Sequence, residues 1–135
     1  MSVESLNQQD TPRVLVIDAD RRVQQSVSDA LQLSGRVAVV GCAGDVRSAL
    51  ELIALRRPSV VVMDPRLPDV TAALGLLSGI HRGWPRLRIV MIGWTDALEH
   101  PQLARWADAV VAKSASPDEF VDAVVAACCA APSSS

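Results

Sequence analysis

The chain has 135 residues, half of them apolar, which is enough to form one domain of ordinary size without disulfide or metal cross-links. No apolar run approaches the roughly 18 to 20 residues of a membrane span, and the start MSVESLNQQDTPR lacks the features of a signal peptide, so we expect a cytoplasmic chain. The net charge of −2, with basic residues scattered along the sequence, argues against contact with nucleic acid or with an anionic membrane.

Five short apolar runs predict buried parallel strands, because strands covered on both faces carry nearly continuous apolar side chains. These runs are residues 13–17, 37–41, 59–63, 87–92 and 108–112. The segments between them carry apolar residues at helical spacing. The stripes are Val23, Val27, Ala30 and Leu31; Val46, Ala49, Leu50 and Ile53; Leu74, Leu77 and Ile80; and Phe120, Val124 and Cys128.

Signals for helix starts agree with this pattern. Asp45 is placed to cap the second helix, and Ser116 to Glu119 combine an N-cap serine, a proline at the first helical position and a capping-box glutamate. Pro101 limits the fourth helix to about residues 102–106. Five βα units predict an α/β fold with a doubly wound, five-stranded parallel sheet, formed by residues 13–130 between flexible tails at 1–12 and 131–135.

Charged residues follow three of the predicted strands. Asp18 and Asp20 come after the first, Asp64 after the third and Lys113 after the fifth. In a doubly wound sheet the carboxyl ends of the strands meet at one crevice, so these groups should converge there. Lys113 is the only lysine among thirteen basic residues, which weakly favours a role for a flexible point charge at that place.

Three motifs carry a resemblance to a known family. VLVIDAD, VVVMDPRLPD and AKSASPDEF resemble the receiver domains of two-component response regulators, over about residues 13–130. The resemblance is closest to receivers that precede a helix-turn-helix DNA-binding domain. It implies a flavodoxin-like (βα)5 fold and a non-enzymatic signalling role, in phosphorelay and transcription regulation, that works through regulated protein contacts.

The resemblance also implies roles for individual residues. Asp64 matches the phosphoacceptor, and Lys113 matches the lysine that pairs with the acceptor and then with the phosphoryl oxygens. Asp18, Asp64 and the backbone carbonyl of Arg66 match the ligands of a magnesium ion. The physical reason is that a carboxylate attacks an anionic phosphoryl donor poorly unless a divalent cation and a lysine offset the charge.

Four positions depart from the family pattern. Ala19 stands where a second acidic metal ligand is expected, and Gly93 stands where a hydroxyl residue contacts the phosphoryl group. Val110 occupies the aromatic switch position, and Trp94 replaces a small residue and is large enough to crowd the pocket. These changes predict weak Mg²⁺ binding and poor switching.

Several alternatives stay open at this level. Asp20 is either the N-cap of the first helix, which we favour, or a further metal ligand, and Thr95 is either a surface residue or a source of the missing hydroxyl. Lys113 could simply keep Asp64 charged. Trp94 and Trp106 are either core residues or anchors at a partner surface. A flavodoxin-type small-molecule site is disfavoured, because no Ser/Thr/Gly-rich loop follows the first strand.

The implied partners are a histidine kinase or phosphotransfer protein, a second copy of the chain, and a DNA-binding domain that would follow Ser135 in a longer protein. The alternative function is a phosphorylation-independent module for protein interaction or dimerisation. The two functions differ in whether Asp64 can be labelled in a metal-dependent reaction.

Overall fold

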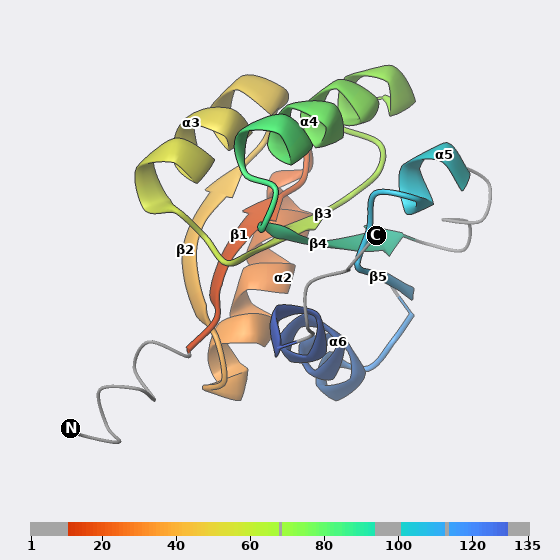
Figure 1. Cartoon of the computed structure of the whole chain (residues 1–135). Coiled ribbons are helices and arrows are strands. Elements are labelled where there is room, and N and C mark those ends of the chain that lie inside the picture. The colour runs from red at the N-terminus through yellow and green to blue at the C-terminus, as the bar shows by residue number, and fades with distance from the viewer. Residues whose placement is uncertain (1–10, 68, 94–100, 113, 130–135) are drawn as a thin grey trace.

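The computed structural model describes residues 11–67, 69–93, 101–112 and 114–129. Five parallel strands form one sheet in the order β2-β1-β3-β4-β5 (Figure 1). The strands are β1 (Arg13–Ile17), β2 (Ala38–Ala43), β3 (Val60–Met63), β4 (Arg88–Gly93) and β5 (Ala109–Ala112). The order reverses next to β1, so the switch point of the sheet lies between β1 and β3. The doubly wound parallel sheet predicted from the sequence is confirmed.

Helices cover both faces of the sheet, with α3 and α4 on one face and α2 and α6 on the other (Figure 1). The helices are α2 (Arg21–Ser34), α3 (Val46–Arg56), α4 (Val70–Gly83), α5 (Pro101–Ala104) and α6 (Pro117–Cys129). Short α5 packs on the α4 side through buried Leu103. None of the described helices is both long and apolar enough to span a bilayer.

Alternation along the strands divides the core into two layers. Leu15 and Ile17 of β1 and Met63 of β3 face α3 and α4, whereas Val14 and Val16 face α2 and α6. All of β3 is buried, since it is the central strand of the sheet. The continuous apolar runs therefore follow from burial on both faces.

Two predicted elements differ from the structure by more than one residue at an end. The second strand is Ala38–Ala43 rather than 37–41, and the fourth helix is Pro101–Ala104 rather than 102–106. Pro101 is compatible with the start of the helix because an N–H at the first helical position has no intrahelical acceptor. Trp106 instead follows the helix in a turn, where its N–H donates to Leu103 O at 3.0 Å.

The caps of the helices are mostly as predicted. The carboxylate of Asp45 accepts from Ser48 N at 2.7 Å, and Ser116 and Glu119 form the reciprocal capping box. Asp69, which was not predicted as a cap, caps α4 by accepting from Ala72 N at 2.9 Å. The prolines that precede Asp69 indicate a loop rather than a helix start, so the sequence carries no clear signal for this cap.

Candidate functional site

Asp18 and Asp64 lie side by side at the carboxyl edge of the sheet. They directly follow Ile17 and Met63, which are paired in register between β1 and β3, and Asp64 N donates to Ile17 O at 3.1 Å. Asp18 is only 5% exposed and Asp64 only 6%. Two neighbouring carboxylates that are both buried repel each other, so this edge is suited to bind a cation.

The turn after β3 fixes the carboxylate of Asp64. Its Oδ1 accepts from Arg66 N at 2.7 Å, across the buried Pro65. The Nε of Arg66 lies 3.9 Å from the same oxygen, but the Arg66 side chain is 59% exposed. This ion pair is therefore weak, and the backbone contact is what orients Asp64.

Asp18 is held by both its backbone and its side chain. Its N–H donates to Ala43 O at 3.0 Å, and its Oδ1 accepts from Asp20 N at 2.8 Å. Gln24, which was not predicted as a site residue, adds a further contact. Its Nε2 donates to Asp18 O at 2.6 Å and to Ala43 O at 3.3 Å. The only signal for it was a polar residue directly beside the apolar stripe of α2.

Asp20 acts as a helix cap. Its carboxylate accepts from Arg22 N at 2.8 Å, which confirms the interpretation that we favoured. Both Ala19 and Asp20 are exposed. Within the described ranges, no group of three or more His, Cys, Asp or Glu side chains is placed to hold a metal ion.

Gly93 ends β4 at the same edge of the sheet. It pairs in register with Ala112 of β5, the residue before Lys113, while the structure of Lys113 itself lies outside the described residues. Among the described residues, a Cβ added at Gly93 would meet only Pro65 Cγ, at 4.0 Å. The site thus has space for a side chain that this sequence does not supply. Trp94 and Thr95 also lie outside the described residues.

Val110 and Trp106 occupy the region where switching was expected. Val110 is 47% exposed on β5, so its side chain fills no internal space. Trp106 is partly buried against the core layer under α4. Its ring packs edge-on against the ring of His81, with 5.4 Å between the ring centroids. Of the two interpretations of Trp106, the structure favours the core residue.

Comparison with known proteins agrees with this geometry. The family model of the response regulator receiver domain matches residues 14–125, so the chain belongs to that family. It is 33% identical over 115 residues to the probable transcriptional regulatory protein NarL of Mycobacterium tuberculosis, covering 84% of this chain and 53% of that protein. The solved receiver domain of the putative regulator NarL from M. tuberculosis superposes with a TM-score of 0.74 at 30% identity, covering 87% of this chain and 96% of that one.

Other similar proteins are an enzyme and a DNA-binding regulator by name. One is a protein-glutamate methylesterase/protein-glutamine glutaminase of Geobacillus kaustophilus, 39% identical over 85 residues, with 63% of this chain and 24% of that protein covered. A LuxR-family DNA-binding response regulator from Staphylococcus aureus has a TM-score of 0.76 at 18% identity, covering 87% of this chain and 98% of that one, which shows the shared fold alone. The chain thus spans about half of NarL and about a quarter of the methylesterase.

The receiver assignment made from the three motifs is therefore confirmed. The protein is a receiver domain of two-component signalling. The roles of the individual site residues stay predictions.

Proposed function

We propose that this receiver domain accepts a phosphoryl group on Asp64 from a histidine kinase or a phosphotransfer protein. The observation that carries the proposal is the pair of buried carboxylates, Asp64 and Asp18, at the switch-point edge of the sheet. In the reaction, an oxygen of Asp64 bonds to phosphorus while the P–N bond of a phosphohistidine breaks. The imidazole nitrogen keeps the electron pair of that bond.

The chain's own residues contribute position and charge. The Arg66 N–H on Asp64 Oδ1 holds the plane of the carboxylate, and the contacts of Gln24 hold the turn that carries Asp18. Lys113, which follows the exposed Ala112, is proposed to pair with the transferred phosphoryl oxygens. Fixed charges of this kind favour the transition state because they need no reorganisation during the reaction.

The donor set suits Mg²⁺, which usually binds through one or two carboxylates and keeps several waters. Asp18, Asp64 and the backbone carbonyl of Arg66 would hold the ion, and Asp20 is a further candidate ligand. When bound, the ion would neutralise charge on the phosphoryl oxygens. Ala19 offers no oxygen ligand from its side chain, so we expect weak binding, with a dissociation constant in the millimolar range or higher.

An exchange at position 19 tests the metal site. Isothermal titration with Mg²⁺ should give at least about tenfold tighter binding to Ala19→Asp than to the parent, because a carboxylate is added for a hard cation. Asp20→Asn tests the further candidate ligand, since asparagine keeps the cap but lacks the charge. Tight binding by the parent would contradict the proposal, and a loss of affinity in Asp20→Asn would assign Asp20 to the metal.

Binding of a phosphoryl mimic tests the acceptor. Beryllofluoride with Mg²⁺ should form an adduct that is detected by ¹⁹F NMR and is absent in Asp64→Asn. The adduct should also require the metal. Failure of the parent to bind the mimic at saturating Mg²⁺ would favour the phosphorylation-independent interaction module.

The longer protein in which this domain acts is proposed to be a transcription regulator. NarL has a larger chain than the matched region, and the Staphylococcus aureus neighbour is named as a DNA-binding regulator of the LuxR family. Such a protein would act in the cytoplasm, through a DNA-binding domain beyond residues 13–130 and through dimers of the receiver. Sequencing the native gene past Ser135 tests this, and a methylesterase domain there would contradict it.

A further inference from the structure

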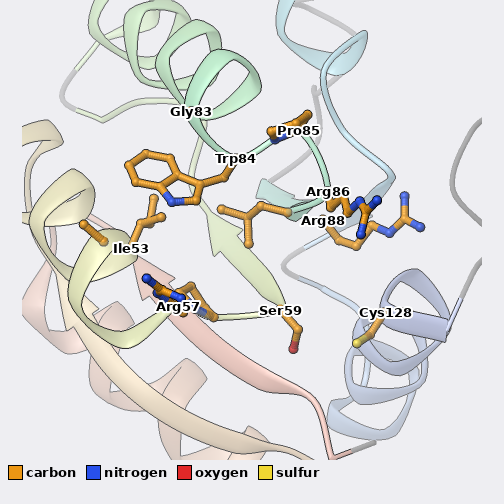
Figure 2. A pocket seen from close by; sticks show the side chains of 12 residues that line it. Ile53, Arg57, Ser59, Gly83, Trp84, Pro85, Arg86, Arg88 and Cys128 are labelled. Carbon is orange, nitrogen blue, oxygen red and sulfur yellow. The ribbon is translucent and has the colours of Figure 1, made fainter.

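A pocket of about 860 Å³ opens at the edge of the sheet opposite to Asp18 and Asp64. It lies between the end of α3, the segment that leads into β3, and the turn from α4 into β4, with Cys128 of α6 at its rim (Figure 2). Its volume falls within the roughly 300–1,000 Å³ of typical small-molecule sites. The receiver chemistry proposed above uses none of its residues.

The pocket carries positive charge. Arg57, Arg86 and Arg88 line it, and no carboxylate does so among the described lining residues. The Nη1 of Arg88 lies 3.7 Å from Oδ1 of Asp108, and the Arg88 side chain is largely buried. Within the described part of the chain, no carboxylate is in ion-pair distance of Arg57 or Arg86. Two arginines that are scattered in sequence thus present exposed guanidinium groups around one cavity.

Trp84 gives the pocket a rigid aromatic wall. The backbone N–H of Trp84 donates to Ile80 O at 2.7 Å, and its backbone carbonyl accepts from Leu87 N at 3.0 Å, which closes a tight turn with Pro85 at the second position. The indole packs partly on the core layer under α3 and α4. Figure 2 shows Trp84 and Arg57 on opposite sides of the hollow.

Arg57 occupies a position where glycine is usual. It is the C-cap of α3 with φ 48° and ψ 62°, a left-handed conformation that costs free energy for a residue with a Cβ. Here the chain carries a long cationic side chain and directs it to the pocket (Figure 2). The position is therefore suited to a test in which the charge is removed without harm to the backbone.

We propose that this pocket binds a planar aromatic anion of the nucleoside monophosphate class. The aromatic ring would pack against Trp84, and the phosphate would bind one guanidinium group of the lining, that of Arg57 or that of Arg86, because guanidinium groups bind phosphate oxygens in a bidentate manner. The hydroxyl of Ser59 does not contribute, since it already accepts from Arg13 N at 2.8 Å and contacts Arg13 O at 3.2 Å. The site is independent of phosphorylation at Asp64.

Titration with AMP in the presence of EDTA tests the proposal, followed by ¹H–¹⁵N NMR of the parent chain. Saturable shifts should appear at Trp84 and Arg86 and not at Asp18 or Asp64. Adenosine, which lacks the phosphate, and inorganic phosphate, which lacks the ring, should each bind at least about tenfold more weakly, as expected for the loss of contacts to a charged group or of ring packing.

Variants assign the residues. Arg57→Gly or Arg86→Gln should weaken AMP binding about tenfold, according to which guanidinium group holds the phosphate. Arg47→Gln is the matched control, because Arg47 lies on the same helix as the Arg57 cap but pairs with Glu51 at 3.5 Å outside the pocket. Glycine suits the left-handed backbone, so the melting temperature of Arg57→Gly should equal or exceed that of the parent.

Four results would overturn the proposal. These are the absence of saturable AMP binding, unchanged affinity in both pocket variants, equal binding of adenosine, and tighter binding of a short polyglutamate peptide than of AMP. The last result would make the pocket a docking site for acidic protein segments. All arms can succeed or fail whether or not Asp64 is phosphorylated.

Discussion

Among the described residues, Asp18 and Asp64 are the two buried carboxylates. Burying a charge costs several kcal/mol unless partners offset it, so an arrangement of two such groups side by side is expensive for the fold alone. The hydrogen bonds from Asp20 N and Arg66 N orient both groups. At the residue scale, this cost is the main physical argument for a charged ligand at this edge.

Restoring a hydroxyl at Gly93 should strengthen the site. Within the described part of the chain, the added Cβ would meet only Pro65 Cγ at 4.0 Å, and Gly93 lies in a strand, where a β-branched residue fits well. Gly93→Thr should bind the beryllofluoride mimic about tenfold more tightly than the parent, because one hydrogen bond to a charged group is gained. The measurement is a titration at fixed Mg²⁺.

Gly93→Ala serves as the control for this change. Alanine alters the backbone entropy as threonine does but brings no hydroxyl. If Gly93→Ala and Gly93→Thr gain equally, the hydroxyl has no role. In that case the missing contact does not limit the site.

The residues of the site were predicted from the sequence to different degrees. Asp18 and Asp64 were predicted because a carboxylate directly after a buried apolar run is conspicuous. Gln24 was not predicted, because its contacts depend on how α2 folds back onto the ends of β1 and β2. The roles of Lys113, Thr95 and Trp94 stay predictions.

At the scale of elements, α2 illustrates how burial decides stability. Leu31 is fully buried against the sheet, whereas Leu33, two positions later, is 87% exposed. Leu31→Ala should lower the free energy of unfolding by about 2–5 kcal/mol, and Leu33→Ala should change it by less than about 0.5 kcal/mol. Urea unfolding of both variants tests this. Similar losses in both would show that α2 packs differently.

The cap of α3 gives a pH dependence with a defined sign. The backbone N–H of Ser48 donates to the Asp45 carboxylate and holds its pKa below the ordinary value of 3.8. A lowered folded-state pKa stabilises the fold above the unfolded pKa, and this contribution is lost as the pH falls through the folded pKa.

Asp45→Asn isolates this effect, because asparagine keeps a cap but does not titrate. The parent should therefore lose stability relative to Asp45→Asn as the pH falls from about 5 to below 3.8. Thermal melts of both chains across this range measure the difference. A constant difference would show that the ionised cap does not stabilise α3.

Strand β2 shows where the sequence pattern was insufficient. The pairing register of β1 with β2 shifts between Val14 and Leu15, so Val39 and Gly41 oppose adjacent residues of β1. This irregularity lets β2 continue to Ala43, beyond the predicted end at residue 41. A bulge of this kind depends on the partner strand and leaves no periodic signal in the run itself.

At the scale of the whole molecule, the two edges of the sheet differ in charge. Buried Asp18 and Asp64 lie at the carboxyl edge, and the pocket with Arg57 and Arg86 lies at the opposite edge. Arg57 and Arg86 are far apart in the sequence, and the fold brings them to one pocket. The sequence alone therefore shows only scattered basic residues. Signal input at one edge and ligand binding at the other would thus be spatially separate.

The domain should switch poorly even when modified. In the family a hydroxyl at the Gly93 position and an aromatic ring at the Val110 position couple the site to the surface of α5, β5 and α6. Loss of one contact to a charged group removes about 1.5 to 3 kcal/mol of bias, a roughly tenfold to hundredfold smaller shift between states.

Amide exchange over residues 101–128 and the oligomeric state, measured with and without bound beryllofluoride, should therefore differ little. The comparison is valid only after binding of the mimic has been confirmed. New dimers or strong new protection in this segment would contradict the expectation. The relay would then run through residues other than Gly93 and Val110.

Direct phosphorylation tests the central claim, that Asp64 is the acceptor of a working receiver. The chain is incubated with acetyl phosphate and Mg²⁺, and the site of added mass is located by rapid mass spectrometry, with Asp64→Asn and Lys113→Ala in parallel. We predict one phosphoryl group on Asp64, none in Asp64→Asn and less in Lys113→Ala. Label on another residue, or undiminished label in Asp64→Asn, would contradict the account.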